Sequence, residues 1–277
     1  MSETTTKPLS KRFLITLFFI ALPIFIFIRW DSSAWVGAQV QQAASDAGYQ
    51  LSYSDLSVSG LGVKLQDVRV QQQQNILELD SLEISPSFST LISGDVGADV
   101  EASWLGNPIS ASVSSSDDLL MLTNIDAMVD VSRIQNLNIP AELAGLMHLQ
   151  GDLVLQQNTG LPQSGKLQLT WNQAKAGLAA PEFTLGDYTL DLNSVDDVSQ
   201  PWQWTIAGGS GVALNGSGTV LPTTPDPKLW LVNGLVDTNI DNSNPSLAMM
   251  MQSMMGSTKA KFRISGSLGA PRTDIVR

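Results

Sequence analysis

The sequence predicts a mainly β protein, in which an N-terminal single transmembrane helix precedes an elongated, antiparallel-rich β domain with few short helices. Three observations lead to this prediction. An uncharged apolar stretch occupies residues 13–28. Apolar and polar residues then alternate with a period of two from Leu51 to Ile264, as they do in strands with one buried face. Turn signals rich in Gly, Asn and Asp separate the alternating runs.

The composition excludes several classes of function. Only 15% of the 277 residues are charged and the formal net charge is -11, so phosphate backbones would repel the chain and nucleic acid is not an expected partner. The chain has no cysteine and a single histidine, which removes disulfides, thiolate metal sites and sites built on several imidazoles. We therefore expect no catalytic residue, no metal and no cofactor, and we predict that the protein is not an enzyme.

The apolar stretch is long enough for a membrane anchor when its flanks are included. Sixteen residues make a helix of about 24 Å, and Lys11, Arg12 and Arg29 can extend their charges to the interfaces. Pro23 is tolerated in such helices. The predicted anchor residues are Phe13, Leu14, Ile15, Leu17, Phe18, Phe19, Ile20, Leu22, Ile24, Phe25, Ile26, Phe27, Ile28 and Trp30.

A cleaved signal peptide is the competing interpretation, because Ser32 and Ala34 could occupy a cleavage site. We favour an uncleaved anchor, since a charge and a tryptophan separate the apolar stretch from these small residues. Positive charge precedes the stretch, which orients the N-terminus toward the cytoplasm. The predicted organisation is a cytoplasmic segment at 1–12, a transmembrane anchor at 13–30 and a periplasmic β-rich domain at 31–277 in the inner membrane of a bacterium.

Within the exported part, the pattern predicts two helices and many strands. Residues 34–47 have apolar side chains at helical spacing and end before Gly48. A long alternating run at 96–104 is expected to form a hairpin with 109–113 across a Gly-Asn-Pro turn. The alternation lapses at 126–147, where we expect a helix or an irregular connection. A second helix is predicted at 245–255 and a last strand at 259–264.

Motifs that carry chemistry are weak in this chain. Asp237, Asn239 and Asp241 have the spacing of the first ligands of a calcium loop, but the position of its bidentate glutamate is Ala248, so a polar loop is the better interpretation. His148 has no partner motif and is expected to be an ordinary strand residue.

Two features are candidate partner contacts. Met249 and Met255 lie beside the apolar stripe of the second predicted helix, where methionines either pack or form an adaptable binding surface. Lys259, Lys261 and Arg263 alternate with apolar residues and would form a basic strip on one face of the last strand. Either this strip protects an edge strand from pairing with other sheets, or it docks an acidic partner.

Four runs carry a resemblance to a known family. They are LSVSGLGVKLQDVRV (56–70), LELDSLEISPSFSTLISGD (77–95), ADVEASWLGNPISASVS (98–114) and FRISGSLGAPR (262–272). Together with the anchor and the Ala-rich helix that ends in Gly-Tyr, they resemble the type II secretion system protein N family and, more distantly, AsmA-like envelope proteins. The first resemblance implies a non-enzymatic inner-membrane component that supports the assembly or function of the export machinery.

The second resemblance leads to an alternative function. AsmA-like proteins carry lipid along an apolar surface lined by a curved sheet, and the alternation seen here would supply such a surface. The expected partners are accordingly the inner membrane, other secretion components, lipid under the alternative, and further copies of the chain. The alternation serves both functions and does not discriminate between them.

Overall fold

The computed structural model describes most of the chain after the predicted anchor. The described residues are 33–46, 48–59, 62–72, 75–87, 96–116, 118–134, 142–177, 183–195, 200–241 and 245–276. The predicted anchor at 13–30 lies outside them. Neither described α-helix has the length and hydropathy needed to cross a membrane.

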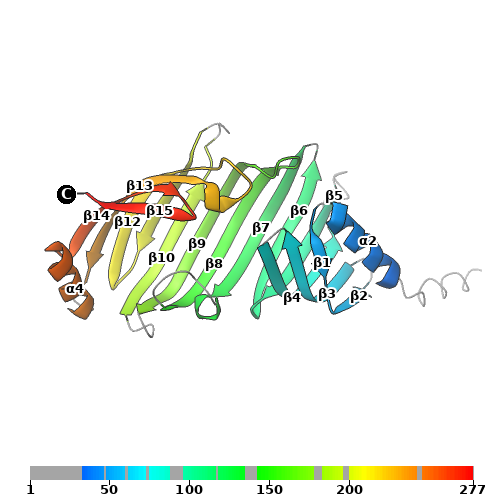
Figure 1. The fold of residues 1–277 in the computed structure, drawn as a ribbon, viewed down its shortest axis with the longest axis horizontal. Coiled ribbons are helices and arrows are strands. Elements are labelled where there is room, and N and C mark those ends of the chain that lie inside the picture. The colour runs from blue at the N-terminus through cyan, green and yellow to red at the C-terminus, as the bar shows by residue number, and fades with distance from the viewer. Residues whose placement is uncertain are drawn as a thin grey trace, which may run out of the picture.

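The described chain forms one antiparallel sheet of fifteen strands, in which nearly every strand pairs with the strand that follows it (Figure 1). The order is β1-β3-β4 and then consecutive to β15, and β2 pairs with β3 beside β1. The strands are β1 (Gln50–Ser52), β2 (Asp55–Ser59), β3 (Gly62–Gln72), β4 (Asn75–Pro86), β5 (Val96–Trp104), β6 (Asn107–Ser116), β7 (Leu119–Asp130), β8 (Glu142–Gln156), β9 (Pro162–Gly177), β10 (Phe183–Asn193), β11 (Trp202–Gly208), β12 (Val212–Leu221), β13 (Leu231–Ile240), β14 (Lys259–Ser267) and β15 (Ala270–Ile275).

The prediction of a mainly β, antiparallel protein with few helices is confirmed. Two α-helices are described, α2 (Ser33–Asp46) and α4 (Pro245–Met255), together with the short 3-10 turns η1 (Val131–Arg133) and η2 (Pro227–Leu229). Gly48 follows α2 with φ 81°, the left-handed conformation that ends many helices. The hairpin predicted around Gly106 is β5–β6, which turns at Leu105 and Gly106.

The prediction of a helix or irregular connection at 126–147 is wrong at 126–130 and 142–147, which form strands, while 135–141 lies outside the described residues. Strand β7 continues to Asp130 and β8 begins at Glu142, with η1 after β7. The alternation was hidden because each strand contains an irregularity: the β7–β8 register shifts between Leu122 and Ile125, and the β8–β9 register shifts between Ala144 and Leu146. An inserted residue reverses the phase of the apolar positions, so the pattern no longer has a strict period of two.

These irregularities also bend the sheet, and carboxylates stabilise them. Asn124 has φ 54° and its backbone N–H donates to Asp152 Oδ1 at 2.9 Å. Gln173 has φ 52° and its N–H donates to Asp187 Oδ1 at 2.6 Å. Each bulge leaves a backbone donor outside the strand ladder, and a carboxylate on the neighbouring strand accepts it. Part of the acidic composition therefore serves to hold the bulges.

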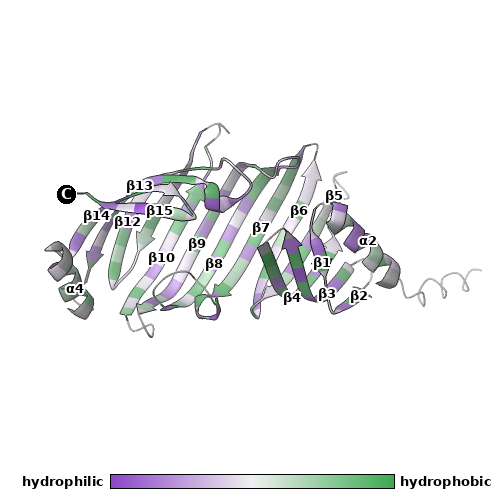
Figure 2. Cartoon of the chain, viewed as in Figure 1, coloured by the Kyte–Doolittle hydropathy of each residue, from purple (hydrophilic) through white to green (hydrophobic). Residues whose placement is uncertain are grey.

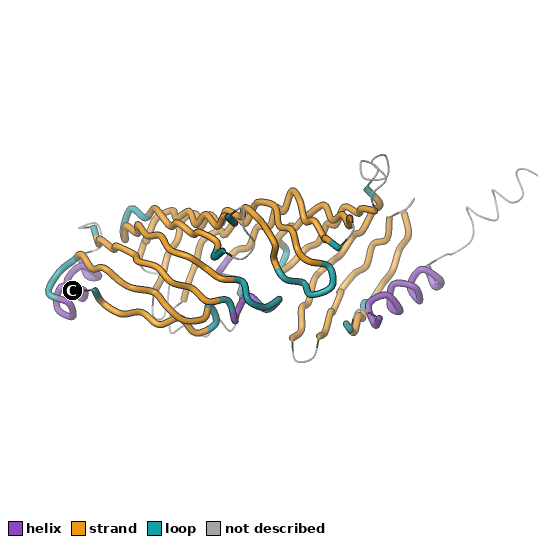
Figure 3. Tube along the Cα trace, turned by 90° about the horizontal axis from the view of Figure 1, so that it is seen from above, coloured by secondary structure: helices purple, strands orange, loops and turns teal. Residues whose placement is uncertain are grey.

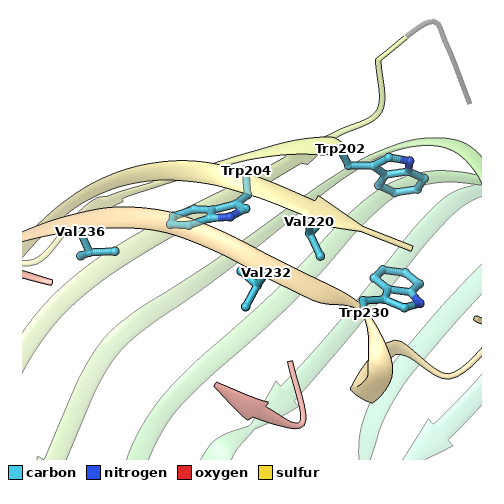
Figure 4. Close-up of a cluster of buried hydrophobic side chains, with 6 residues drawn as sticks. All are labelled: Trp202, Trp204, Val220, Trp230, Val232 and Val236. Carbon is cyan, nitrogen blue, oxygen red and sulfur yellow. The ribbon is translucent and has the colours of Figure 1, made fainter. Parts of the chain in front are cut away.

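The sheet curls at its C-terminal end. Strands β13 to β15 lie in front of β8 to β10 in Figure 1, and Figure 3 shows the two layers from above. The core lies between them and contains side chains at 2 to 8% exposure, among them three tryptophans (Figure 4). Its members are Trp202, Trp204, Val220, Trp230, Val232 and Val236. Leu153 of β8 and Leu190 of β10 pack against this cluster from the facing layer.

Glycines on the same sheet face make room for the indoles. A Cβ on Gly218 would lie 2.7 Å from the Trp204 ring, and one on Gly234 would overlap that ring. A Cβ on Gly165 would lie 3.1 Å from Trp202. The indole nitrogen of Trp204 donates to the Thr219 carbonyl at 3.2 Å, so this buried polar atom has a partner. Two large rings therefore pack flat against the sheet.

At the other end, α2 contacts β1 and β2. The contact is close because Gly37 faces Tyr53 and Leu56: a Cβ there would lie 2.6 Å from the Tyr53 hydroxyl. Leu65 and Val68 of β3 are each only 1% exposed, so this end has its own small buried centre. The helix covers the first strands of the sheet, whereas β15 at the C-terminal end has no such cover in the described residues.

Candidate contact surfaces

The strand register separates the sheet into two faces with different chemistry. Cα partners on adjacent strands project to the same side, so the pairing from β5 to β15 assigns each side chain to a face. We call the face that carries Leu153, Leu190 and Trp204 the inner face, and the opposite one the outer face. Figure 2 shows the corresponding bands of hydrophobic and hydrophilic residues alternating along the strands.

The inner face continues as an apolar surface beyond the buried core. On β5 to β9 this face is mostly apolar: besides Trp104 and Trp171 it carries a set of aliphatic and methionine side chains, each of which is half-buried. We call this set the open apolar face: Val100, Ala102, Ile109, Ala111, Val113, Leu122, Ala127, Val129, Met147, Leu149, Leu167 and Leu169. Apolar surface of this extent is unusual on an isolated domain and marks places where lipid or other proteins bind.

The open apolar face was expected from the alternation, but its location was not. Nearly every strand before β15 carries an apolar face, so the pattern alone does not say which strands the curled C-terminal layer covers. The structure buries the inner face of β11 to β13 in the tryptophan cluster, with Leu153 of β8 and Leu190 of β10 packed against it, and leaves the residues of the open apolar face half-buried. The open apolar face is the surface best suited to binding.

The basic strip lies on the outer face of β14. Lys259, Lys261 and Arg263 are exposed, and the residues between them are half-buried, as the alternation predicts. The edge-strand interpretation is wrong, because β14 pairs with β13 on one side and β15 on the other. The sequence beyond Ile264 contains a further hairpin, whose second strand has Pro271 and little apolar alternation, and this is why it was missed.

Acidic residues accompany the basic strip. Lys261 Nζ lies 3.5 Å from Asp237 Oδ1, and both side chains are exposed. Arg263 has Asp274 as its Cα partner on β15. A surface hollow of about 410 Å³ is lined by Lys259 and Lys261 together with Asp237 and its neighbours. The strip is therefore partly neutralised within the chain, which weakens the case that it docks an acidic partner.

The predicted methionine contact is resolved only for Met249. This side chain is 66% exposed on α4, whereas the adjacent Ala248 is 8% exposed and faces the protein. The side chain of Met255 lies outside the described residues. Of the α4 side chains that the structure describes, Met249 is the exposed methionine that a partner could contact.

His148 is a strand residue of β8, and its side chain forms a contact that the sequence did not predict. Its Nε2 lies 2.9 Å from Asp126 Oδ1 on the outer face, and the Gln150 amide donates to Asp126 Oδ2 at 3.2 Å. These hydrogen bonds, that from His148 first, lower the pKa of the Asp126 carboxyl. The pairing depends on the register after the bulge in β7, so no spacing in the sequence reveals it.

Other residues with unusual surroundings have structural explanations. The Tyr188 hydroxyl donates to the Val212 carbonyl at 2.7 Å, and burial raises the pKa of Tyr188 to about 12. Asp237 and Asn239 of the weak calcium pattern are exposed residues of β13 rather than loop ligands. Among the described residues, no three acidic or histidine side chains gather in a way that could hold a metal ion.

The chain was compared with known proteins. No family model, no curated protein and no solved structure matches it.

Proposed function

We propose that the protein is a non-enzymatic, inner-membrane-anchored periplasmic component of the type II secretion system, which supports the assembly or function of the export machinery. Its N-terminus would lie in the cytoplasm and the sheet in the periplasm. The support comes from the four resembling runs, the uncharged stretch at 13–28 and the positive charge that precedes it. The antiparallel sheet is consistent with the repeated β organisation that the resemblance implies.

The open apolar face supports this proposal because it provides a surface to which another protein can bind. Its aliphatic side chains are half-buried in the chain, so a partner that covers them would remove apolar area from water at about 25 cal/mol per Å². An accessory protein requires a binding surface rather than a catalytic centre. We assign the contact with other secretion components to this face.

The test is a secretion assay in a strain that lacks the gene. Loss of an exported enzyme from the medium, with its accumulation in the periplasm, is expected. The wild-type chain should restore export, and a chain with Leu149→Asn and Leu122→Asn on the open apolar face should not. Leu146→Asn is the matched control, since Leu146 lies on the outer face of the same strand and is 39% exposed. Normal secretion in the deletion strain would refute the proposal.

Lipid binding is the second candidate, and the same face favours it. A continuous surface of Ala, Val, Ile and Leu side chains, without a charged residue among its members, fits acyl chains as well as apolar protein segments. Native mass spectrometry of the full-length chain would detect co-purified lipid. Lipid that is lost in the Leu149→Asn/Leu122→Asn chain and retained in Leu146→Asn, together with normal secretion in the deletion strain, would favour this candidate over the first.

The membrane topology is tested separately. A reporter fused after Arg277 should be active only when it is of a type that works in the periplasm. A mature N-terminus near Trp35 would instead show that the apolar stretch is a cleaved signal peptide.

A further inference from the structure

The C-terminal edge of the sheet is an exposed strand. All six residues of β15 are exposed, and β15 pairs only with β14 in the described chain. An uncovered edge presents unpaired backbone donors and acceptors to a further strand. At the opposite end of the sheet, α2 contacts β1 and β2.

The hydrogen-bond pattern shows which backbone groups of β15 point outward. The N–H of Val276 donates to the Lys261 carbonyl at 2.8 Å, which makes these two residues a hydrogen-bonded pair. Hydrogen-bonded and non-hydrogen-bonded pairs alternate along an antiparallel ladder. Ala270, Arg272 and Asp274 therefore bond to β14, whereas Pro271, Thr273 and Ile275 direct their backbone groups away from the sheet.

The side chains of this edge are complementary to a second copy of themselves. Arg272 and Asp274 lie on one face of β15, one residue on either side of Thr273. If two copies pair antiparallel about Thr273, each Arg272 lies opposite Asp274 of the other copy, so both charged pairs are attractive. Centring the pairing on Arg272 or on Asp274 would instead place like charges opposite each other.

The backbone supports the same arrangement. Centred on Thr273, the outward N–H and carbonyl groups of the two Thr273 residues bond to each other, and the Ile275 N–H faces the carbonyl of Pro271 in the second copy. Pro271 has no N–H, so the Ile275 carbonyl that lies opposite it in the other copy has no partner. This occurs once on each side of the two-fold axis. On the inner face, Pro271 and Ile275 come together, and Ile275 is 53% exposed in the single chain.

We propose that the protein forms a two-fold symmetric dimer by antiparallel pairing of β15 with β15 of a second copy. The two sheets then become one, with both inner faces on the same side. The two-fold axis closes the association at two copies, because both chains use the same edge for the contact. A short strand buries little area, so the dimer is weak and reversible.

Disulfide trapping tests the register directly, because the native chain has no cysteine. In the dimer the two Thr273 Cα atoms are about 5.5 Å apart, which suits a disulfide. The full-length Thr273→Cys chain in detergent micelles should oxidise to a covalent dimer. Ser217→Cys is the matched control, since Ser217 is exposed on the outer face of the interior strand β12. Equal oxidation of both variants would overturn the proposal.

Charge exchange provides the second test, read by sedimentation velocity at low and high salt. Arg272→Asp alone and Asp274→Arg alone each create two like-charge pairs and should weaken dimerisation about tenfold. The double exchange restores opposite charges and should restore the dimer. Circular dichroism confirms that each variant is folded. A native chain that remains monomeric at its highest soluble concentration, or a double exchange that behaves like the single variants, would overturn the proposal.

Discussion

The covered C-terminal half of the sheet and the open middle of the sheet share one face but differ in burial. In the C-terminal half, the inner face carries tryptophans, of which Trp202 is 2% exposed. In the middle, the inner face carries aliphatic side chains that remain half-buried. The difference arises because the last strands curl back over part of the sheet (Figure 3) and enclose the tryptophan cluster, and none of the residues that form that cluster or pack against it comes from β5 to β7.

The comparison shows that one repeating pattern can produce a core and a binding surface in the same sheet. The C-terminal half combines large rings with glycines at neighbouring positions of the same sheet face, so the rings lie close to the sheet backbone. The middle of the sheet carries smaller aliphatic side chains on that face, and they remain half-buried. The folding energy is therefore concentrated in the C-terminal half, and the middle retains apolar surface for a partner.

Removing a buried ring should have the largest effect. Trp202→Ala is expected to lower the free energy of unfolding by about 3–5 kcal/mol, because it leaves a cavity beside Val220 and Trp230. Urea unfolding followed by circular dichroism measures it. A loss below about 1 kcal/mol would show that the C-terminal cluster is not the stabilising core.

Adding a methyl group at a facing glycine should have the next largest effect. Gly234→Ala places a Cβ against the Trp204 ring and should cost about 1–3 kcal/mol through overpacking. Gly256→Ala, at a position with no atom within 4 Å but with φ 73°, is a control for backbone strain alone. If both variants lose the same stability, the close contact with Trp204 is not the cause.

Truncation on the open apolar face should be milder. Leu149→Ala is expected to cost about 1 kcal/mol, less than in a full core, since Leu149 is already partly in contact with water. The native chain should also bind a dye such as ANS, and a Leu149→Asn variant should bind less of it. A loss as large as that of Trp202→Ala would mean that the middle of the sheet is covered as well.

The smallest effect on the free energy of unfolding is expected for Asp126, which lies on the outer face of the sheet. The pKa of Asp126 is lowered in the folded state by its hydrogen bonds to His148 and Gln150, so this carboxylate contributes stability above the unfolded-state pKa of about 3.9. The contribution is lost as the pH falls through the folded-state pKa. Asp126→Asn should cost less than about 1 kcal/mol at pH 7, because the pair is partly exposed.

The measurement for Asp126 is urea unfolding between pH 7 and pH 3. The difference between native and Asp126→Asn chains should shrink as the pH falls below about 3.9. A difference that stays constant over this range would show that packing, and not the carboxylate charge, is responsible. Glu101→Gln, at an exposed position of β5, is a surface carboxylate control.

Local elements were predictable where short-range chemistry determines them. Residues 245–255 form a helix with the predicted bounds, and 96–104 forms a hairpin with the strand after Gly106. Strands β7 and β8 were missed at 126–147, because a bulge conceals the alternation on which the prediction depends. The hydrogen bond between His148 and Asp126 was missed for the same reason, since it requires the register across that bulge.

The sequence by itself determined that the chain alternates into antiparallel strands, that one helix precedes them and another interrupts them, and that no cysteine chemistry is available. These properties depend on side-chain periodicity and on turn residues close together in the chain. The tertiary structure alone decided which part of the apolar face is covered, that β14 is an interior strand and that β15 is the uncovered edge. Those outcomes depend on the combined bulges and twist of all fifteen strands, which determine the path of the sheet. No short sequence pattern reveals that combined effect.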